Sequence, residues 1–190
     1  MRSVLGAALA LLRRHAGAAY LASGVATLAN TVPDVVRKVL VWDDPSGLHA
    51  LGVAVVGVLT ALVAQLWVTG ALAGLPSNGA LRWRGALRRG TGLAWRAVRA
   101  APGTVLAGVL AGGAVSALVT FPASVAALGW DRLFGPLDAP GVGAFTVAAV
   151  SDVLASWLTL PFLALVLVLV AAGSGAQAGS VRPRPGTSQR

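Results

Sequence analysis

Three long stretches of this chain carry almost no charge. Positions 45 to 81 and 100 to 130 contain no charged residue, and positions 139 to 181 contain only Asp152. Only 11% of all residues are charged, against roughly 25% in soluble domains. A helix needs about 20 apolar residues to cross the hydrocarbon core of a bilayer. The pattern therefore predicts three membrane-spanning helices, at Ala50–Leu75, Pro102–Leu128 and Val142–Ala172.

A fourth and weaker span is predicted at His15–Val32 (HAGAAYLASGVATLANTV), which is rich in small residues. The apolar run before it, Leu5–Leu12, is followed directly by Arg13 and Arg14. Arginine is costly in the lipid interior and favourable at its surface. We therefore expect a short interfacial helix at the N-terminus, followed by the first span.

Basic segments alternate with nearly neutral ones along the chain. The N-terminal segment, the linker Ser77–Arg99 and the C-terminal tail carry arginines and no acidic residue, whereas Pro33–Gly47 and Gly129–Gly141 are close to neutral. Four spans place every basic segment on one side, as the positive-inside rule requires. Three spans would put the N-terminal arginines on the opposite side. With every basic segment on the inner side, we expect both termini in the cytoplasm. The excess of Ala, Gly, Val and Arg is typical of a G+C-rich bacterial genome, so we expect the membrane to be a bacterial inner membrane.

The linker Leu81–Arg99 (LRWRGALRRGTGLAWRAVR) is amphipathic. At about 100° per residue, most of its apolar residues gather on one face and its arginines on the other. We interpret it as a helix in the inner interface, with a break near Gly90–Gly92 as one option. The alternative is a solvated loop that only sets topology; nucleic-acid binding is not expected. The predicted contacts to anionic lipid phosphates are Arg82, Arg84, Arg88, Arg89, Arg96 and Arg99.

The two halves of the chain share a pattern at a spacing of 86 to 90 residues, which begins with Gly6–Gly17 over Gly92–Gly103. The matching segments are Thr31-Val32-Pro33 with Thr120-Phe121-Pro122, Trp42-Asp43 with Trp130-Asp131, and Trp67-Val68-Thr69 with Trp157-Leu158-Thr159. Duplication is one explanation and chance similarity is the other. We expect an all-α membrane protein with one domain over residues 1–172. Its repeats would cover 1–75 and 81–172, and residues 173–190 are predicted to form a disordered cytoplasmic tail.

This layout and the segment Gly92–Leu110 (GLAWRAVRAAPGTVLAGVL) resemble a group of bacterial multi-pass membrane proteins. The group includes the membrane domain attached to some glycerophosphodiester phosphodiesterases and related uncharacterised membrane families. Those proteins also open with an amphipathic segment, repeat helical pairs and carry arginine-rich inner linkers. An acidic-then-basic motif expected after the last span is absent, since Gly173–Ser180 (GSGAQAGS) stands there. The resemblance implies a membrane fold and no catalytic activity.

Asp152 is the one ionisable residue deep inside these three predicted spans. A carboxylate in that position should face the protein interior, stay protonated or pair with a cation. It is either part of a proton, cation or substrate pathway, or a helix-end residue near the outer interface. In the connector Trp42–His49 (WDDPSGLH), the acidic residues and the histidine match no metal motif, and Asp-Pro-Ser-Gly favours a turn. The chain also has no cysteine, so no thiolate metal site exists. We expect no catalytic residues, no metal and no cofactor.

The sequence thus favours a non-enzymatic membrane component that acts through partners or lipids. The expected partners are anionic lipids of the inner leaflet, with a protein partner or a second copy of the chain as further options. The alternative function is a small transporter or permease subunit with Asp152 near its pathway, which requires Asp152 to face a polar cavity. An intramembrane enzyme would require a polar cluster formed by Asp43, Asp44, His49, Asp131 and Asp152.

Overall fold

The computed structural model describes residues 2–133 and 139–180. Within these ranges the regular structure is helical throughout. The helices are α1 (Arg2–Arg14), α2 (Ala16–Leu40), α3 (Gly47–Leu72), α4 (Leu75–Asn78), α5 (Ala86–Ala100), α6 (Pro102–Leu128), α7 (Trp130–Leu133) and α8 (Val142–Ser180).

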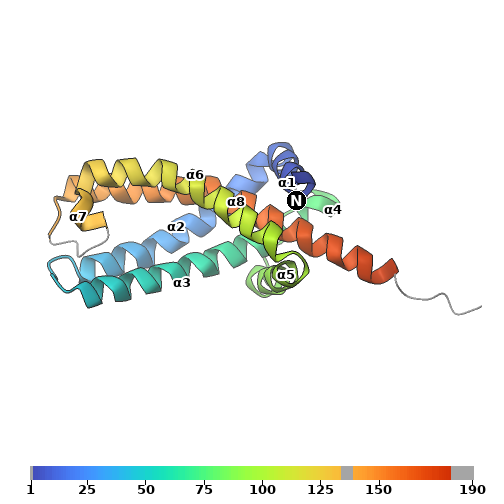
Figure 1. The fold of residues 1–190 in the computed structure, drawn as a ribbon, viewed down its shortest axis with the longest axis horizontal. Helices are drawn as coiled ribbons and strands as arrows, with labels where there is room; N and C mark the ends of the chain where they lie inside the picture. Colours follow the sequence, from blue (N-terminus) through green and yellow to red (C-terminus); the bar gives the residue numbers. More distant parts are fainter. Residues whose placement is uncertain (1, 134–138, 181–190) are drawn as a thin grey trace, which may run out of the picture.

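Four long helices, α2, α3, α6 and α8, run along the long axis of the molecule (Figure 1). Their directions alternate along the chain, so α1 and α5 lie at one end of the bundle and the α2–α3 connector and α7 lie at the other. The helix α5 is seen nearly end-on in this view and therefore crosses the bundle axis. It packs on α3 and α8, while α6 packs along α8. We call the end with α1 and α5 the basic end.

The buried core lies mainly toward the basic end. Its largest fully buried side chains include Leu72, Leu75 and Leu165. Away from this end, α3 and α6 expose large apolar side chains, such as Val58 at 69% and Leu118 at 76%. Soluble proteins rarely expose apolar surface so extensively, whereas lipid covers it at no cost. Among the described residues, three helical segments are long and apolar enough to cross a membrane: Gly47–Asn78, Pro102–Leu128 and Val142–Gly173.

Two glycines allow α5 to cross α3 at backbone contact. A Cβ atom on Gly70 of α3 would overlap the carbonyl group of Ala86, and a Cβ on Gly90 of α5 would overlap the carbonyl of Leu66. Both glycines are buried. The helix α5 is continuous through Gly90 and Gly92, so the break considered there from the sequence does not occur. Instead, Gly90 serves close packing, the role that small residues play between membrane helices.

A proline in α8 is accommodated by a hydrogen bond from α2. Pro161 has no N–H group, so the carbonyl of Trp157, one turn earlier, lacks its helical donor. The hydroxyl of Ser23 on α2 donates to this carbonyl at 2.8 Å. The indole Nε1 of Trp157 in turn donates to the carbonyl of Tyr20, also at 2.8 Å. This exchange fixes the α2–α8 crossing.

We therefore expect Ser23→Ala to destabilise the chain by about 1 kcal/mol, a value within the range measured for hydrogen bonds between membrane helices. In a Pro161→Ala background the backbone N–H of residue 161 can donate to the carbonyl of Trp157, so Ser23→Ala should cost less stability there. Unfolding of the four variants in a denaturing detergent titration measures both costs. Equal costs in the two backgrounds would contradict this account of the crossing.

The three strong spans agree closely with the sequence prediction, and the first segment does not. The predicted Pro102–Leu128 coincides with α6, whereas α2 extends to Leu40. The prediction of a connector at Pro33–Gly47 is therefore wrong for residues 33–40. The helix α8 continues through Ser180, into the segment predicted to be a disordered tail, and residues 181–190 lie outside the described residues.

The arrangement expected of two repeats is met only in part. The helix α1 packs on α8 and α5 packs on α3, which are equivalent contacts if α1–α3 and α5–α8 are repeats. The helix α2 also packs along α8, but α6 makes no comparable contact with α3. Duplication therefore stays a prediction.

Candidate functional site

The extension of α2 beyond Pro33 carries charged residues into the bundle. Proline removes one backbone donor, yet α2 continues because the next turns are stabilised by ion pairs within the helix. Asp34 pairs with Arg37 at spacing i,i+3 and with Lys38 at spacing i,i+4. Such spacings place side chains on one helix face. All three side chains are largely shielded, with exposed fractions of 14% for Asp34, 15% for Arg37 and 27% for Lys38.

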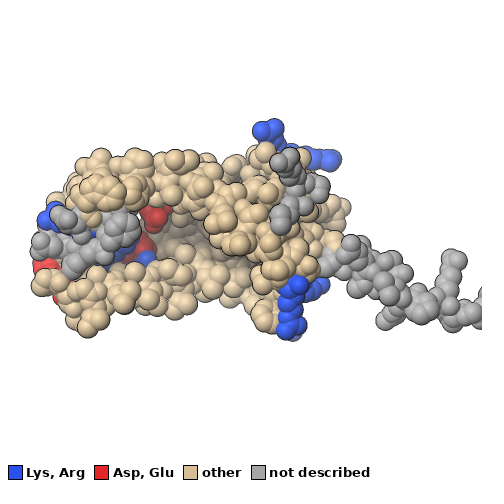
Figure 2. Space-filling model, viewed as in Figure 1, with Lys and Arg blue, Asp and Glu red and all other residues tan. Residues whose placement is uncertain are grey.

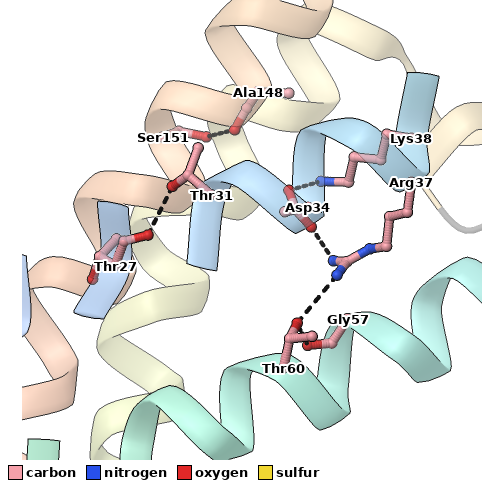
Figure 3. A network of polar contacts seen from close by, with 9 residues as sticks. All are labelled: Thr27, Thr31, Asp34, Arg37, Lys38, Gly57, Thr60, Ala148 and Ser151. Carbon is pink, nitrogen blue, oxygen red and sulfur yellow. Dashed lines mark hydrogen bonds and ion pairs between the residues drawn. The ribbon is translucent and has the colours of Figure 1, made fainter. Parts of the chain in front are cut away.

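The three charges form a connected network between α2 and α3 (Figure 3). Lys38 Nζ donates to Asp34 Oδ2 at 2.8 Å, and Arg37 Nη2 donates to Asp34 Oδ1. Arg37 Nη1 also donates to Thr60 Oγ1 at 3.2 Å. The guanidinium lies directly against Gly57, where a Cβ would overlap it. Because Gly57 has no side chain, this position of α3 leaves space for the guanidinium of Arg37.

Asp152 on α8 lies between two cavities. One, of about 310 Å³, is lined by α2, α6, α7 and α8 and includes Lys38, Thr120, Ser124 and Arg132. The other, of about 40 Å³, lies among α2, α3 and α8 and includes Asp34. We call the larger one the Asp152 cavity. Among the described residues, the Asp152 carboxylate has no hydrogen-bond or ion-pair partner. In Figure 2, acidic and basic atoms are visible in a hollow away from the basic end.

The Arg37–Thr60 contact of the charged network lies well along α3 from the basic end, although Lys38 is only two residues from the end of α2 at Leu40. Thr60, which binds Arg37, is ten residues before Gly70 on α3, or about 15 Å at 1.5 Å per residue. Gly70 marks the crossing with α5. If α5 lies at the inner interface, the Arg37–Thr60 contact is near the middle of a hydrocarbon core of about 30 Å. Charges at this depth are functional-site candidates by default.

A third cavity, of about 580 Å³, lies between α2 and α3. Its lining is almost wholly apolar and includes Val56, Leu59 and Val63. Asn30 and Ala64 line both this cavity and the small polar one. The cavity carries no group that would orient a polar ligand strongly, so the charged network is the better site candidate.

The residues required for an intramembrane enzyme do not converge in the part of the chain that is described. Asp44 lies in the α2–α3 connector and bonds His49, while Asp152 is inside the bundle. Hydrogen bonds from the His49 ring and from the backbone N–H of Ser46 lower the pKa of Asp44 below its usual value. The chain turns at residues 41–43, just before the predicted Asp-Pro-Ser-Gly turn, whose Gly47 begins α3. Across residues 2–133 and 139–180, no group of three potential metal ligands is found.

The predicted lipid-contact arginines of the linker lie at the basic end, on or just before α5. Arg89 is half-buried and donates from Nε to the carbonyl of Gly70 at 3.3 Å and from Nη2 to the carbonyl of Arg82 at 2.5 Å. It therefore braces the α3–α5 crossing. Arg99 stacks over the ring of Trp95 at 4.3 Å. Five of the six side chains are exposed: Arg82, Arg84, Arg88, Arg96 and Arg99.

Sequence reasoning identified Asp152 and missed the network beside it. The available signal was the spacing of Asp34 with Arg37 and Lys38, which favours a helix. Placing a connector after Val32 put these residues outside the bundle. The structure instead brings four residues from α2, α3 and α8 to one region: Asp34, Arg37, Thr60 and Asp152. Comparison of the chain with protein-family models, curated proteins and solved structures finds no match in any of the three.

Proposed function

We propose that this chain is a non-enzymatic, four-span protein of a bacterial inner membrane that admits a small polar solute to the Asp152 cavity. It would act as a small transporter or as a permease subunit. The observation that carries the proposal is the position of Asp152, a carboxylate with no hydrogen-bond or ion-pair partner among the described residues, which lines a polar cavity between membrane-type helices. Ionisable side chains within membrane helices usually face the bundle interior or a water-filled cavity and mark solute or ion pathways.

The fourth span of this proposal is α2. Its 25 residues reach about 37 Å at 1.5 Å per residue, enough to cross a core of about 30 Å. It packs against α3 and α8 in the bundle. Its charges fall outside the usual composition of a span, which agrees with a helix that lines a polar cavity rather than one that faces lipid. Both termini would then be cytoplasmic, because the basic end carries the arginines of α1 and α5.

A second candidate function follows from the exposed arginines of the linker. Together with the exposed apolar side chains of Trp95 and Val98, they suit a helix in an anionic lipid interface. In this role the chain would be a membrane component that acts through lipids or a protein partner. The two functions are compatible, since the arginines and the Asp152 cavity lie at different depths.

Cysteine labelling tests the proposal on a chain that contains no cysteine of its own. A membrane-impermeant maleimide added to intact cells should modify Ser124→Cys, which lines the Asp152 cavity. It should leave Leu118→Cys unmodified, because this position on the same helix is 76% exposed on an apolar surface. Only a thiol in contact with water forms the reactive thiolate. Equal labelling of both variants, or none at Ser124→Cys, would overturn the proposed water-filled cavity.

Two further cysteine variants test the membrane topology in the same assay. Asp43→Cys, in the exposed α2–α3 connector, should be labelled from outside, and Ser77→Cys, exposed in α4 at the basic end, should be labelled only after the cells are opened. The reverse pattern would contradict the proposed orientation. Labelling of neither variant in intact cells would contradict exposure of the α2–α3 connector at the outer surface.

A further inference from the structure

We propose that the Asp152 cavity binds a small zwitterion, a solute with an ammonium group and a carboxylate or phosphate group. This inference rests on the proposed function and names the class of its solute. It follows from a cavity that combines an acidic side chain and a basic side chain from two different helices, Asp152 of α8 and Lys38 of α2.

Lys38 supplies the anion-binding side. An ammonium group has three N–H donors. One donor bonds Asp34 Oδ2 at 2.8 Å, so two are left for the anionic group of a solute. Arg132 of α7 lines the same cavity and adds a second positive charge to this side. Thr60 and Gly57 keep Arg37 on the α3 side, so Lys38 is the network cation that faces the cavity.

Asp152 supplies the cation-binding side. An ionised carboxylate only accepts hydrogen bonds, with about four lone-pair positions. The Asp152 carboxylate accepts no hydrogen bond from the described residues, and it is exposed to the cavity. An ammonium group of a solute would supply both the donors and the charge that this carboxylate lacks. Charge-assisted hydrogen bonds of this kind are the strongest that a small solute can make.

The neutral walls suit a solute of this size and polarity. Thr120 donates its hydroxyl to the carbonyl of Ser116 at 3.0 Å, which leaves the oxygen as an acceptor toward the cavity. Ser124 adds a second hydroxyl. The ring of Phe145 is held edge-on by Trp42 at 4.9 Å and can face an ammonium group. The volume of about 310 Å³ is at the lower limit of ordinary ligand sites, about 300 Å³.

The lining carries groups of both signs, which suits a zwitterion better than a simple ion. Asp152 is acidic, and Lys38 and Arg132 are basic. A lone cation would engage only the acidic side and a lone anion only the basic side, whereas a zwitterion engages both.

Titration calorimetry on the full-length chain in a non-ionic detergent tests this inference. The probes are L-alanine and glycerophosphoethanolamine, a phosphodiester with one negative charge, with ethylamine and acetate as single-charge controls. Both zwitterions contain an ammonium group, and they differ in carrying a carboxylate or a phosphate. We expect at least one zwitterion to bind and neither control to bind with comparable affinity. Asp152→Asn and Lys38→Gln should each weaken binding about tenfold or more, the cost of one charged hydrogen bond.

Asp43→Asn serves as the matched control, because it removes a carboxylate from an exposed connector outside the cavity. It should bind as the unmodified chain does. Ser124→Ala is the second test, since it changes no charge and should weaken binding without disturbing the ionic network. Thermal unfolding of each variant shows whether it is folded. Absence of heat with both zwitterions, equal binding of the single-charge controls, or unchanged binding in Asp152→Asn would overturn the inference.

The same measurement in nanodiscs separates a free solute from a lipid headgroup. If the natural ligand is a phosphatidylethanolamine headgroup, glycerophosphoethanolamine should bind in phosphatidylglycerol discs and lose affinity in phosphatidylethanolamine discs. If it is a free solute, the two lipids should give the same affinity. Both results support a zwitterion site. Labelling of Ser124→Cys together with failure of both probes would leave the polar cavity intact and reject only its ligand.

Discussion

Replacing Gly90 by alanine is expected to prevent stable folding of the chain in detergent. The added Cβ would overlap the carbonyl of Leu66 in the backbone of α3, and no change of rotamer relieves a clash with backbone. Overpacking between side chains costs about 1–3 kcal/mol, so displacement of α5 from α3 should cost at least the upper value. That is a large part of the 5–15 kcal/mol that usually stabilises a protein. Gly70→Ala should behave in the same way, because its Cβ would overlap the carbonyl of Ala86.

Gly92→Ala is the matched control on the same helix. No atom lies within 4 Å of a Cβ built on Gly92, and alanine favours a helix over glycine by up to about 1 kcal/mol. This variant should therefore be as stable as the original chain or slightly more so. Thermal unfolding and size-exclusion profiles of the purified variants compare the three directly. Equal stability of Gly90→Ala and Gly92→Ala would refute the backbone crossing of α3 and α5.

The sequence alone predicts much of the helical frame, because lipid imposes a simple rule on composition. Residues 102–128 form one helix with the predicted limits, and Val142 begins the last long helix as expected. The amphipathic linker forms a helix from Ala86 onward but not over residues 81–85, and its apolar Leu93 and Ala94 pack against the core. Such features depend on local periodicity and on uninterrupted apolar length, which a single sequence displays directly.

The end of α2 was mispredicted because two local signals favour opposite structures. Pro33 and the charges after it suggest a connector by composition, whereas the spacing of Asp34 to Lys38 suggests another helical turn. Tertiary contacts decide between them, since Arg37 reaches Thr60 on α3, 23 positions along the chain. A contact of this kind has no signature in one sequence.

The candidate site was predicted in one residue only, for the same reason. Asp152 is conspicuous as a lone charge in an apolar stretch. Its neighbours in space come from α2 and α6, and Lys38 and Ser124 are distant from it in the sequence. The role of Gly57 is equally hidden, because a glycine that gives space to an arginine is indistinguishable by composition from the other glycines of the chain.

Asp34→Asn is expected to destabilise the chain by about 3 kcal/mol, the lower part of the range for loss of one partner from a buried ion pair. Asp34 is the shared partner of Arg37 and Lys38. An asparagine keeps the shape but leaves two adjacent cations without their common counter-charge. Unfolding in a denaturing detergent titration measures the loss. Asp43→Asn, on the exposed connector, should change stability by less than about 0.5 kcal/mol.

Removing all three charges together separates stability from function. In the triple variant Asp34→Asn, Arg37→Gln, Lys38→Gln the network of α2 holds no unpaired charge, so its stability should return toward that of the original chain, as found when whole buried ion networks are replaced. A triple variant less stable than Asp34→Asn would show that the network is a net source of stability. Recovered stability together with lost zwitterion binding would instead show that the bundle tolerates the cost of these charges because the solute requires Lys38.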